Sequence, residues 1–156
     1  MRGASPFLTV AKSERTEHNG GMTEHVDWDE LRIEAAEAAG RAYSPYSRTP
    51  MGAAALLDDG SILTGCSVEN ASFGLSLCAE CGLVSALYDS GGGRFVGVTV
   101  VDAYGNLLTP CGRCRQLLYE TGGPELLVDS PDGPRRLDQL LPDAFTADHL
   151  AETTGI

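Results

Sequence analysis

The chain has 156 residues, and 42 % of them are hydrophobic, which is enough for one domain with a single core. No run of eighteen apolar residues occurs, and residues 1–21 lack the pattern of a secretory signal, so we expect neither a membrane span nor export. With 11 Lys and Arg against 22 Asp and Glu, the formal net charge is −11. This charge repels phosphate backbones, so it excludes a typical nucleic-acid binder and favours a small, weakly charged ligand. We expect a cytoplasmic protein.

The beginning of the chain is polar and has no apolar period. We therefore expect a disordered leader over residues 1–24 and one folded domain over residues 25–156. Over residues 28–42, apolar side chains recur at steps of three and four. This spacing predicts an amphipathic helix, with Asp27 as its N-cap and Gly40 near its end.

A hairpin and a second helix follow. Residues 51–57 and 61–68 flank the turn-forming sequence Asp-Asp-Gly at 58–60, which predicts two paired strands. Residues 77–88 are apolar on nearly all sides, which predicts a buried helix that ends before the glycines at 91–93.

The second half of the chain alternates strands and helices. The β-branched run at 95–101 predicts a buried central strand, and the stretch at 111–120 predicts a helix after Pro110. Residues 125–128 predict a further strand, and residues 137–150 predict one or two short helical pieces. This order of elements is typical of an α/β protein with a layered sheet.

The five cysteines indicate a metal site. Four of them form two pairs with the same spacing, Cys78-x-x-Cys81 and Cys111-x-x-Cys114. An odd number of cysteines in a cytoplasmic chain favours metal binding over disulfides. Cys66 stands outside this pattern and fits a small buried hydrophobic residue.

Two kinds of zinc site fit these pairs. A closed site with four cysteine ligands would be structural, whereas three protein ligands and a water would make the site catalytic. Glu80 lies between Cys78 and Cys81, and Pro110 precedes the second pair. Because Zn²⁺ lowers the pKa of a bound water from 15.7 to about 7, a carboxylate beside a ligand can pass the proton to a substrate nitrogen and a leaving amine. The reaction predicted is hydrolytic deamination.

Zinc deaminases carry the pattern His-x-Glu…Pro-Cys-x-x-Cys, and Cys78 stands here in the position of the histidine. The chain resembles the cytidine deaminase family, in particular its small, three-cysteine, homotetrameric nucleoside type. The resemblance extends from about Trp28 to Leu150. It rests on residues 43–47 (YSPYS), 52–54 (GAA), 65–75 (GCSVENASFGL), 78–80 (CAE), 110–116 (PCGRCRQ) and 140–145 (LLPDAF).

The resemblance implies a fold and a cofactor. The fold would be a three-layer α/β/α arrangement with a mixed, roughly five-stranded central sheet. One Zn²⁺ per chain would be bound by Cys78, Cys111 and Cys114, with Glu80 as the proton shuttle. The enzyme would act on a small nucleoside as a homotetramer, with no nucleic-acid or membrane partner.

The resemblance also implies substrate contacts. The backbone N–H of Ala79 would hold the pyrimidine carbonyl, and Glu69 would bind a sugar hydroxyl. Phe145 would reach the base pocket of a neighbouring subunit. Taken alone, Glu69 also fits a solvated surface carboxylate and Phe145 a core or docking aromatic.

Three thiolates and one Zn²⁺ sum to a net charge of −1, so the centre needs positive potential nearby. Cys78 and Cys111 both begin predicted helices, whose N-terminal N–H groups can stabilise thiolates. Many family members have an Arg where this chain has Cys81, although a subset carries Cys-Ala-Glu-Cys. Cys81 would lie beside the ligands but cannot supply the charge of that Arg.

Two residues depart from the family pattern. Thr49 stands where the family usually has a Phe that packs against the base, which predicts a looser or more polar base pocket. Ser67 stands where the family usually has an Asn that grips the ribose together with Glu69, and the shorter serine side chain cannot donate and accept through two separate groups as an amide does. Neutral drift and a changed substrate both explain these residues.

The leading hypothesis is zinc-dependent deamination of cytidine, deoxycytidine or a modified cytosine nucleoside, with release of ammonia. A second hypothesis is a deaminase of a cytosine-containing natural product, of the blasticidin type. A third is a structural zinc module with four cysteine ligands.

Overall fold

The computed structural model describes residues 26–154, so the leader expected over residues 1–24 lies outside the described residues. A five-stranded sheet in the order β2-β1-β3-β4-β5 forms the middle layer. Its strands are β1 (Met51–Leu57), β2 (Ile62–Cys66), β3 (Phe95–Asp102), β4 (Leu127–Val128) and β5 (Arg135–Arg136). Strands β3 and β4 are parallel and the other pairs are antiparallel, which confirms the predicted mixed sheet.

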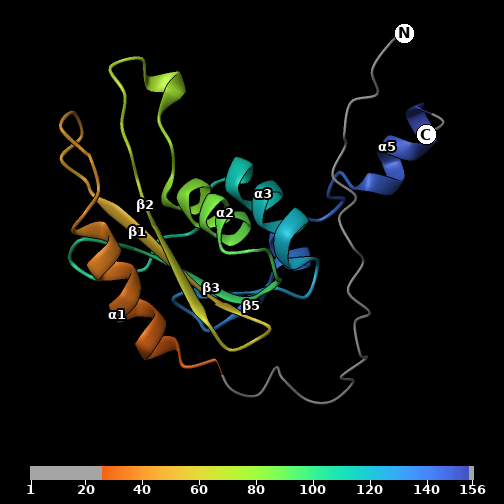
Figure 1. Ribbon diagram of the computed structural model, residues 1–156, viewed down its shortest axis with the longest axis horizontal. Coiled ribbons are helices and arrows are strands. Elements are labelled where there is room, and N and C mark those ends of the chain that lie inside the picture. Colours follow the sequence, from red (N-terminus) through yellow and green to blue (C-terminus); the bar gives the residue numbers. More distant parts are fainter. Residues whose placement is uncertain (1–25, 155–156) are drawn as a thin grey trace, which may run out of the picture.

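Helices cover both faces of this sheet (Figure 1). Helix α1 (Trp28–Ala39) packs on one face, and α2 (Ala79–Asp89) and α3 (Gly112–Gly122) pack on the other. Each of the two interfaces has its own cluster of buried apolar side chains. The three-layer α/β/α arrangement is therefore confirmed.

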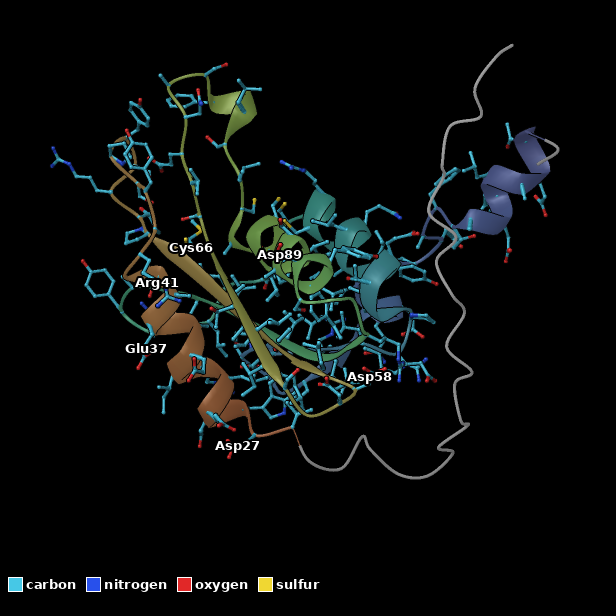
Figure 2. All side chains as sticks on the ribbon, in the orientation of Figure 1. Asp27, Glu37, Arg41, Asp58, Cys66 and Asp89 are labelled. Atoms are coloured by element: carbon cyan, nitrogen blue, oxygen red, sulfur yellow. The ribbon has the colours of Figure 1, made fainter. Side chains whose placement is uncertain are left out.

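Helix α1 begins and ends where its sequence predicts. Asp27 is the N-cap and accepts a hydrogen bond from the backbone N–H of Glu30 at 3.0 Å, and Gly40 is the C-cap. Figure 2 shows Asp27 and Glu37 on the solvent side of the helix. The opposite side packs closely on β1, where a Cβ at Gly52 would lie 1.9 Å from the carbonyl oxygen of Ala35.

The layer of α2 and α3 carries the larger core. Leu83, Leu87 and Leu118 on the helices pack with Phe95 and Val98 of the central strand β3, and all five are fully buried. The predicted hairpin, helix and central strand are all present, but α2 is buried on one side only, and Ser85 and Tyr88 on its other side are exposed. This packing fixes the N-terminal ends of α2 and α3 relative to each other.

The C-terminal part follows the prediction less closely. The strand predicted at 125–128 has only two residues, and β5 and a short 3-10 helix, η2 (Phe73–Leu75), were not predicted. The side chains of β5 are two exposed arginines, so the strand has no apolar alternation. The helical pieces predicted at 137–150 are α4 (Leu137–Leu140) and α5 (Ala147–Thr154), and Figure 1 shows α5 apart from the layers. No helix within residues 26–154 is long and apolar enough to cross a membrane.

Candidate active site and metal centre

Two helices on the same face of the sheet begin with a cysteine. Cys78 is the N-cap of α2 and Cys111 is the N-cap of α3, both in extended backbone conformation. The first N–H groups of a helix have no partner within it, and the helix dipole places partial positive charge there. The predicted placement of these cysteines at helix N-termini is confirmed.

Three cysteine sulfurs meet at this point. The Sγ atoms of Cys78, Cys111 and Cys114 all lie within 4.8 Å of one another. In a tetrahedral zinc site with Zn–S bonds of about 2.3 Å, sulfurs lie about 3.8 Å apart, so a small inward movement suffices. Cys114 is buried, Cys78 is half-buried and Cys111 is exposed. The three thiols fit a zinc ion that solvent reaches from the side of Cys111.

The surroundings act differently on the three thiols. Burial raises the pKa of Cys78 and of Cys114, and the charge of Glu80 raises the pKa of both further. Burial also acts on Cys111, but the N–H groups of Cys114 and Arg113 and the neighbouring thiols outweigh it and lower its pKa. Two of the three sulfurs therefore need a cation beside them to ionise, which a coordinated metal supplies.

Glu80 is the second residue of α2 and is only 4 % exposed. Burial raises the pKa of its carboxyl group, and its own backbone N–H and the thiol of Cys114 partly oppose this rise. A carboxyl group with a raised pKa beside three potential metal ligands is better suited than an ordinary carboxylate to accept and return a proton.

Cys81 lies outside the cluster of three sulfurs. Its Sγ accepts a hydrogen bond from Nη2 of Arg113 at 3.3 Å. Cys66, labelled in Figure 2, lies on β2 and is also not part of the cluster. Among residues 26–154 the sulfurs thus form a group of three rather than a group of four.

Glu69 is held by one turn of the chain. Its carboxylate accepts hydrogen bonds from the backbone N–H groups of Tyr46 (2.9 Å) and Ser47 (3.2 Å) and from the hydroxyl of Ser47. The hydrogen bond from the Ser47 side chain is the main cause of the lowered pKa of Glu69. Backbone hydrogen bonds in both directions between Val68 and Leu77 bring this carboxylate to the segment that leads into Cys78.

The two departures from the family pattern lie on two neighbouring chain segments, Thr49 on the turn that holds Glu69 and Ser67 directly after β2. Thr49 is exposed, and its N–H donates to the hydroxyl of Ser47 at 3.0 Å. Ser67 is only 7 % exposed, and its hydroxyl accepts from the N–H of Met51 at 3.1 Å. The hydroxyl of Ser67 therefore joins the segment after β2 to the start of β1.

The remaining predicted residues lie on the helical side. Ala79 is the first residue of α2 and is buried. Phe145 is 58 % exposed and stacks on His149, and its carbonyl oxygen accepts from Nε2 of Gln116 on α3 at 2.8 Å. The chain's own contacts therefore leave the Phe145 ring accessible.

Two contacts were missed from the sequence. Nothing in the sequence assigns Ser47 to Glu69, because they are separated by 22 positions and meet only through the fold. Arg113 did have a signal, since it is the cation between two predicted metal ligands. Its partner, Cys81, becomes visible only when α2 and α3 are placed side by side.

Comparison with known proteins decides the family. Residues 26–129 match the sequence model described as the cytidine and deoxycytidylate deaminase zinc-binding region, and this range contains the three clustered cysteines. The chain belongs to this deaminase family. The predicted family and the zinc cofactor are confirmed, and the blasticidin-type and structural-module alternatives are not favoured.

Individual relatives agree. Cytidine deaminase from Mycobacterium tuberculosis is 60 % identical over 125 residues, which cover 80 % of this chain and 94 % of that protein. Cytidine deaminase from Halalkalibacterium halodurans is 38 % identical over 130 residues, covering 80 % of this chain and 98 % of that protein. The sequence similarity therefore extends over almost the full length of these relatives.

Solved structures share the fold. The crystal structure of cytidine deaminase from M. tuberculosis has a TM-score of 0.77 at 60 % identity and covers 78 % of this chain and 99 % of that chain. The structure from M. leprae has a TM-score of 0.75 at 55 % identity and covers 76 % and 100 %.

Proposed function

We propose that the protein is a zinc-dependent hydrolase that converts cytidine or deoxycytidine to the corresponding uridine with release of ammonia. The observation that carries this proposal is the juxtaposition of three clustered cysteine sulfurs with the buried carboxyl group of Glu80 at the start of α2. Relatives at up to 60 % identity bear the name cytidine deaminase.

Cys78, Cys111 and Cys114 would hold the zinc ion, one per chain. Zinc bound there would lower the pKa of a coordinated water to near neutral pH and so make it a nucleophile. The N-terminal N–H groups of α2 and α3 offset the negative charge of the three thiolates.

Glu80 would carry the proton. Its carboxylate takes a proton from the attacking water and delivers it to the ring nitrogen next to the amino-bearing carbon. The water oxygen bonds to that carbon, and the second proton of the same water passes through Glu80 from the new hydroxyl group to the amino group. The carbon–nitrogen bond then breaks, and ammonia leaves as the hydroxyl oxygen becomes the carbonyl of uridine. Burial supports this role, because it brings the pKa of the Glu80 carboxyl closer to the operating pH.

Two groups would orient the nucleoside. The N–H of Ala79, in the first turn of α2, would donate to the pyrimidine carbonyl, since such N–H groups lack partners within the helix. Glu69 would accept from a sugar hydroxyl, and the hydrogen bonds from Tyr46 and Ser47 keep its carboxylate ionised and oriented for this.

Thr49 and Ser67 would set how tightly the nucleoside is held. Thr49 would face the base with a hydroxyl and a methyl group instead of an aromatic ring, which reduces apolar contact. Because Ser67 is shorter than Asn and its oxygen already accepts from the N–H of Met51, sugar recognition would rest mainly on Glu69. These contacts favour a weaker grip on the nucleoside rather than a different reaction.

We infer a homotetramer. Two loops at one end of the sheet expose large apolar side chains beside the cysteine cluster, and their tips touch through Tyr46 and Phe73. The exposed side chains are Tyr43, Tyr46, Val68, Phe73, Leu75 and Leu77. An exposed apolar surface of this kind is typical of a protein interface, and Phe145 would complete a neighbouring subunit's base pocket. Five free cysteines favour the reducing cytoplasm as the compartment.

A substrate panel tests the proposal. Zinc-loaded protein should convert cytidine and deoxycytidine, and the change in ultraviolet absorbance and the release of ammonia measure this conversion. Free cytosine should remain almost unreacted, because it lacks the sugar that Glu69 binds. The Glu80→Gln variant serves as the control for contaminating activity. Equal turnover by that variant, or no turnover of any cytosine nucleoside, would refute the proposal.

A further inference from the structure

The helices α2 and α3 begin with the same arrangement of two cysteines. In α2 the N-cap is Cys78 and the third helical residue is Cys81, and in α3 these positions are Cys111 and Cys114. The N-cap backbone angles are almost equal, with φ −66° and ψ 157° at Cys78 and φ −67° and ψ 167° at Cys111. Local backbone geometry therefore offers both pairs to one metal ion in the same way.

The two pairs nevertheless have different outcomes. Both cysteines of α3 join the cluster, whereas α2 contributes Cys78 alone. Since helix geometry is shared, the exclusion of Cys81 needs another cause. The structure shows one at its sulfur, where Nη2 of Arg113 donates a hydrogen bond at 3.3 Å. Arg113 is the second residue of α3 and stands between the two ligands of that helix.

This contact matters for chemistry because the number of thiolates decides the kind of site. Four cysteine ligands fill a tetrahedral zinc site and leave no position for water, whereas three leave one position open. A guanidinium group is always charged, donates only, and cannot bind a metal. Its N–H engages a lone pair on Cys81 that a metal ion would otherwise use.

We propose that Arg113 is a positioning residue that holds the Cys81 side chain away from the cluster and thereby keeps the zinc site open. The proposal rests on the zinc centre of the proposed function but assigns a separate role to a residue that binds neither metal nor substrate. In this chain, with two Cys-x-x-Cys pairs facing each other, one hydrogen bond separates an open site from a closed one.

Four variants test this role. Arg113→Ala removes the hydrogen bond, and Arg113→Lys keeps a cation with N–H donors. Cys81→Ala/Arg113→Ala removes both partners. Arg135→Ala removes an exposed arginine of β5 and serves as the matched control. One sample of each variant is loaded with Zn²⁺ and alkylated, and peptide mass spectrometry identifies which thiols have reacted. A second sample is loaded with Co²⁺, and the intensity of the thiolate-to-metal absorption bands reports the number of thiolate ligands.

In the wild type and in Arg135→Ala, alkylation should mark Cys66 and Cys81, and the cobalt bands should correspond to three thiolates. In Arg113→Ala, the metal should protect Cys81, the cobalt bands should become stronger, and deamination should fall on the order of 10- to 100-fold. The double variant should regain most of the lost activity, because no fourth thiolate is left to bind. Arg113→Lys should stay close to the wild type.

Two results would overturn the proposal. One is an Arg113→Ala protein that keeps three-thiolate bands and a reactive Cys81. The other is a double variant as inactive as Arg113→Ala, which would mean that Arg113 acts through its charge alone. The alkylation and cobalt measurements need no turnover, so a failure of the deaminase proposal itself would be recognised separately, as zinc-loaded wild type without activity.

Discussion

Gly65 on β2 lies directly under the first turn of α2, where a Cβ at position 65 would stand 2.4 Å from the carbonyl oxygen of Ala79. The same Cβ would stand 2.4 Å from the backbone nitrogen of Leu83. These neighbours are backbone atoms, so the helix as a whole would have to move. The residue type at position 65 therefore controls where Cys78 and Glu80 are presented.

We expect Gly65→Ala to reduce both stability and activity. Forcing α2 away from the sheet should lower the free energy of unfolding by about 1–3 kcal/mol, which thermal or denaturant unfolding measures. Gly112→Ala is the control, because a Cβ there meets nothing within 4 Å and alanine favours a helix by up to about 1 kcal/mol. Equal stability of the two variants would show that the close approach has no energetic role.

The zinc ligands can be separated by single substitutions. Cys78→Ser, Cys111→Ser and Cys114→Ser should each lose zinc, because each removes one of the three sulfurs that meet in the cluster. Cys81→Ser should keep about one zinc per chain, since the Cys81 sulfur lies outside the cluster and accepts a hydrogen bond from Arg113. Metal analysis of the purified proteins decides this, and equal zinc loss in all four would establish a closed site.

Much of the fold was predictable because its signals are local. The cap at Asp27, the hairpin turn at 58–60 and the β-branched run of β3 each mark an element within a few residues. The short strand β5 was not predictable, because its two arginines have no apolar pattern and pair only through contact with β4.

The candidate site divides in the same way. Short sequence motifs contain the three clustered cysteines and Glu80, so these residues were predictable. The structure brings together Cys78, Cys111, Cys114 and Glu80. The contacts of Ser47 with Glu69 and of Arg113 with Cys81 join segments that are 22 and 32 positions apart. Such pairs depend on how loops and helices are packed, which residue spacing does not encode.

We expect Glu80→Gln to keep zinc and the fold but to lose turnover on the order of 10²–10⁴-fold, because the amide cannot accept a proton. Substrate binding should survive. Calorimetric titration of the variant with cytidine, in competition with the product uridine, measures it. Turnover near that of the wild type on the best substrate would mean that another group carries the proton.

The contact between Ser47 and Glu69 predicts a change in KM. Ser47→Ala removes the hydroxyl that orients the Glu69 carboxylate, so KM for cytidine should rise up to about tenfold while kcat changes little. Ser61→Ala is the matched control, because it removes a similar serine-to-carboxylate hydrogen bond, to Asp59 at 2.6 Å, in the turn of the β1–β2 hairpin. A rise in KM shared by both variants would contradict the assignment.

The same variant should change the pH dependence of KM. The Ser47 hydrogen bond lowers the pKa of Glu69, so its carboxylate stays charged as the pH falls below the ordinary glutamate range. Without that hydrogen bond the pKa rises, and the carboxylate is protonated at a higher pH. The increase of KM on the acid side should therefore begin at a higher pH in Ser47→Ala than in the wild type.

Phe145 gives a test of assembly that does not depend on counting subunits alone. Phe145→Ala should lose most activity if the ring completes a neighbour's pocket, and Glu80→Gln is inactive by itself. When the two variants are unfolded, mixed and refolded, shared tetramers should regain activity, because a Glu80→Gln subunit supplies its intact Phe145 to a neighbour with an intact Glu80. A mixture of Glu80→Gln with the double variant Glu80→Gln/Phe145→Ala is the control and should stay inactive. No recovery in the first mixture, together with a monomer in analytical ultracentrifugation, would show that Phe145 acts within its own chain.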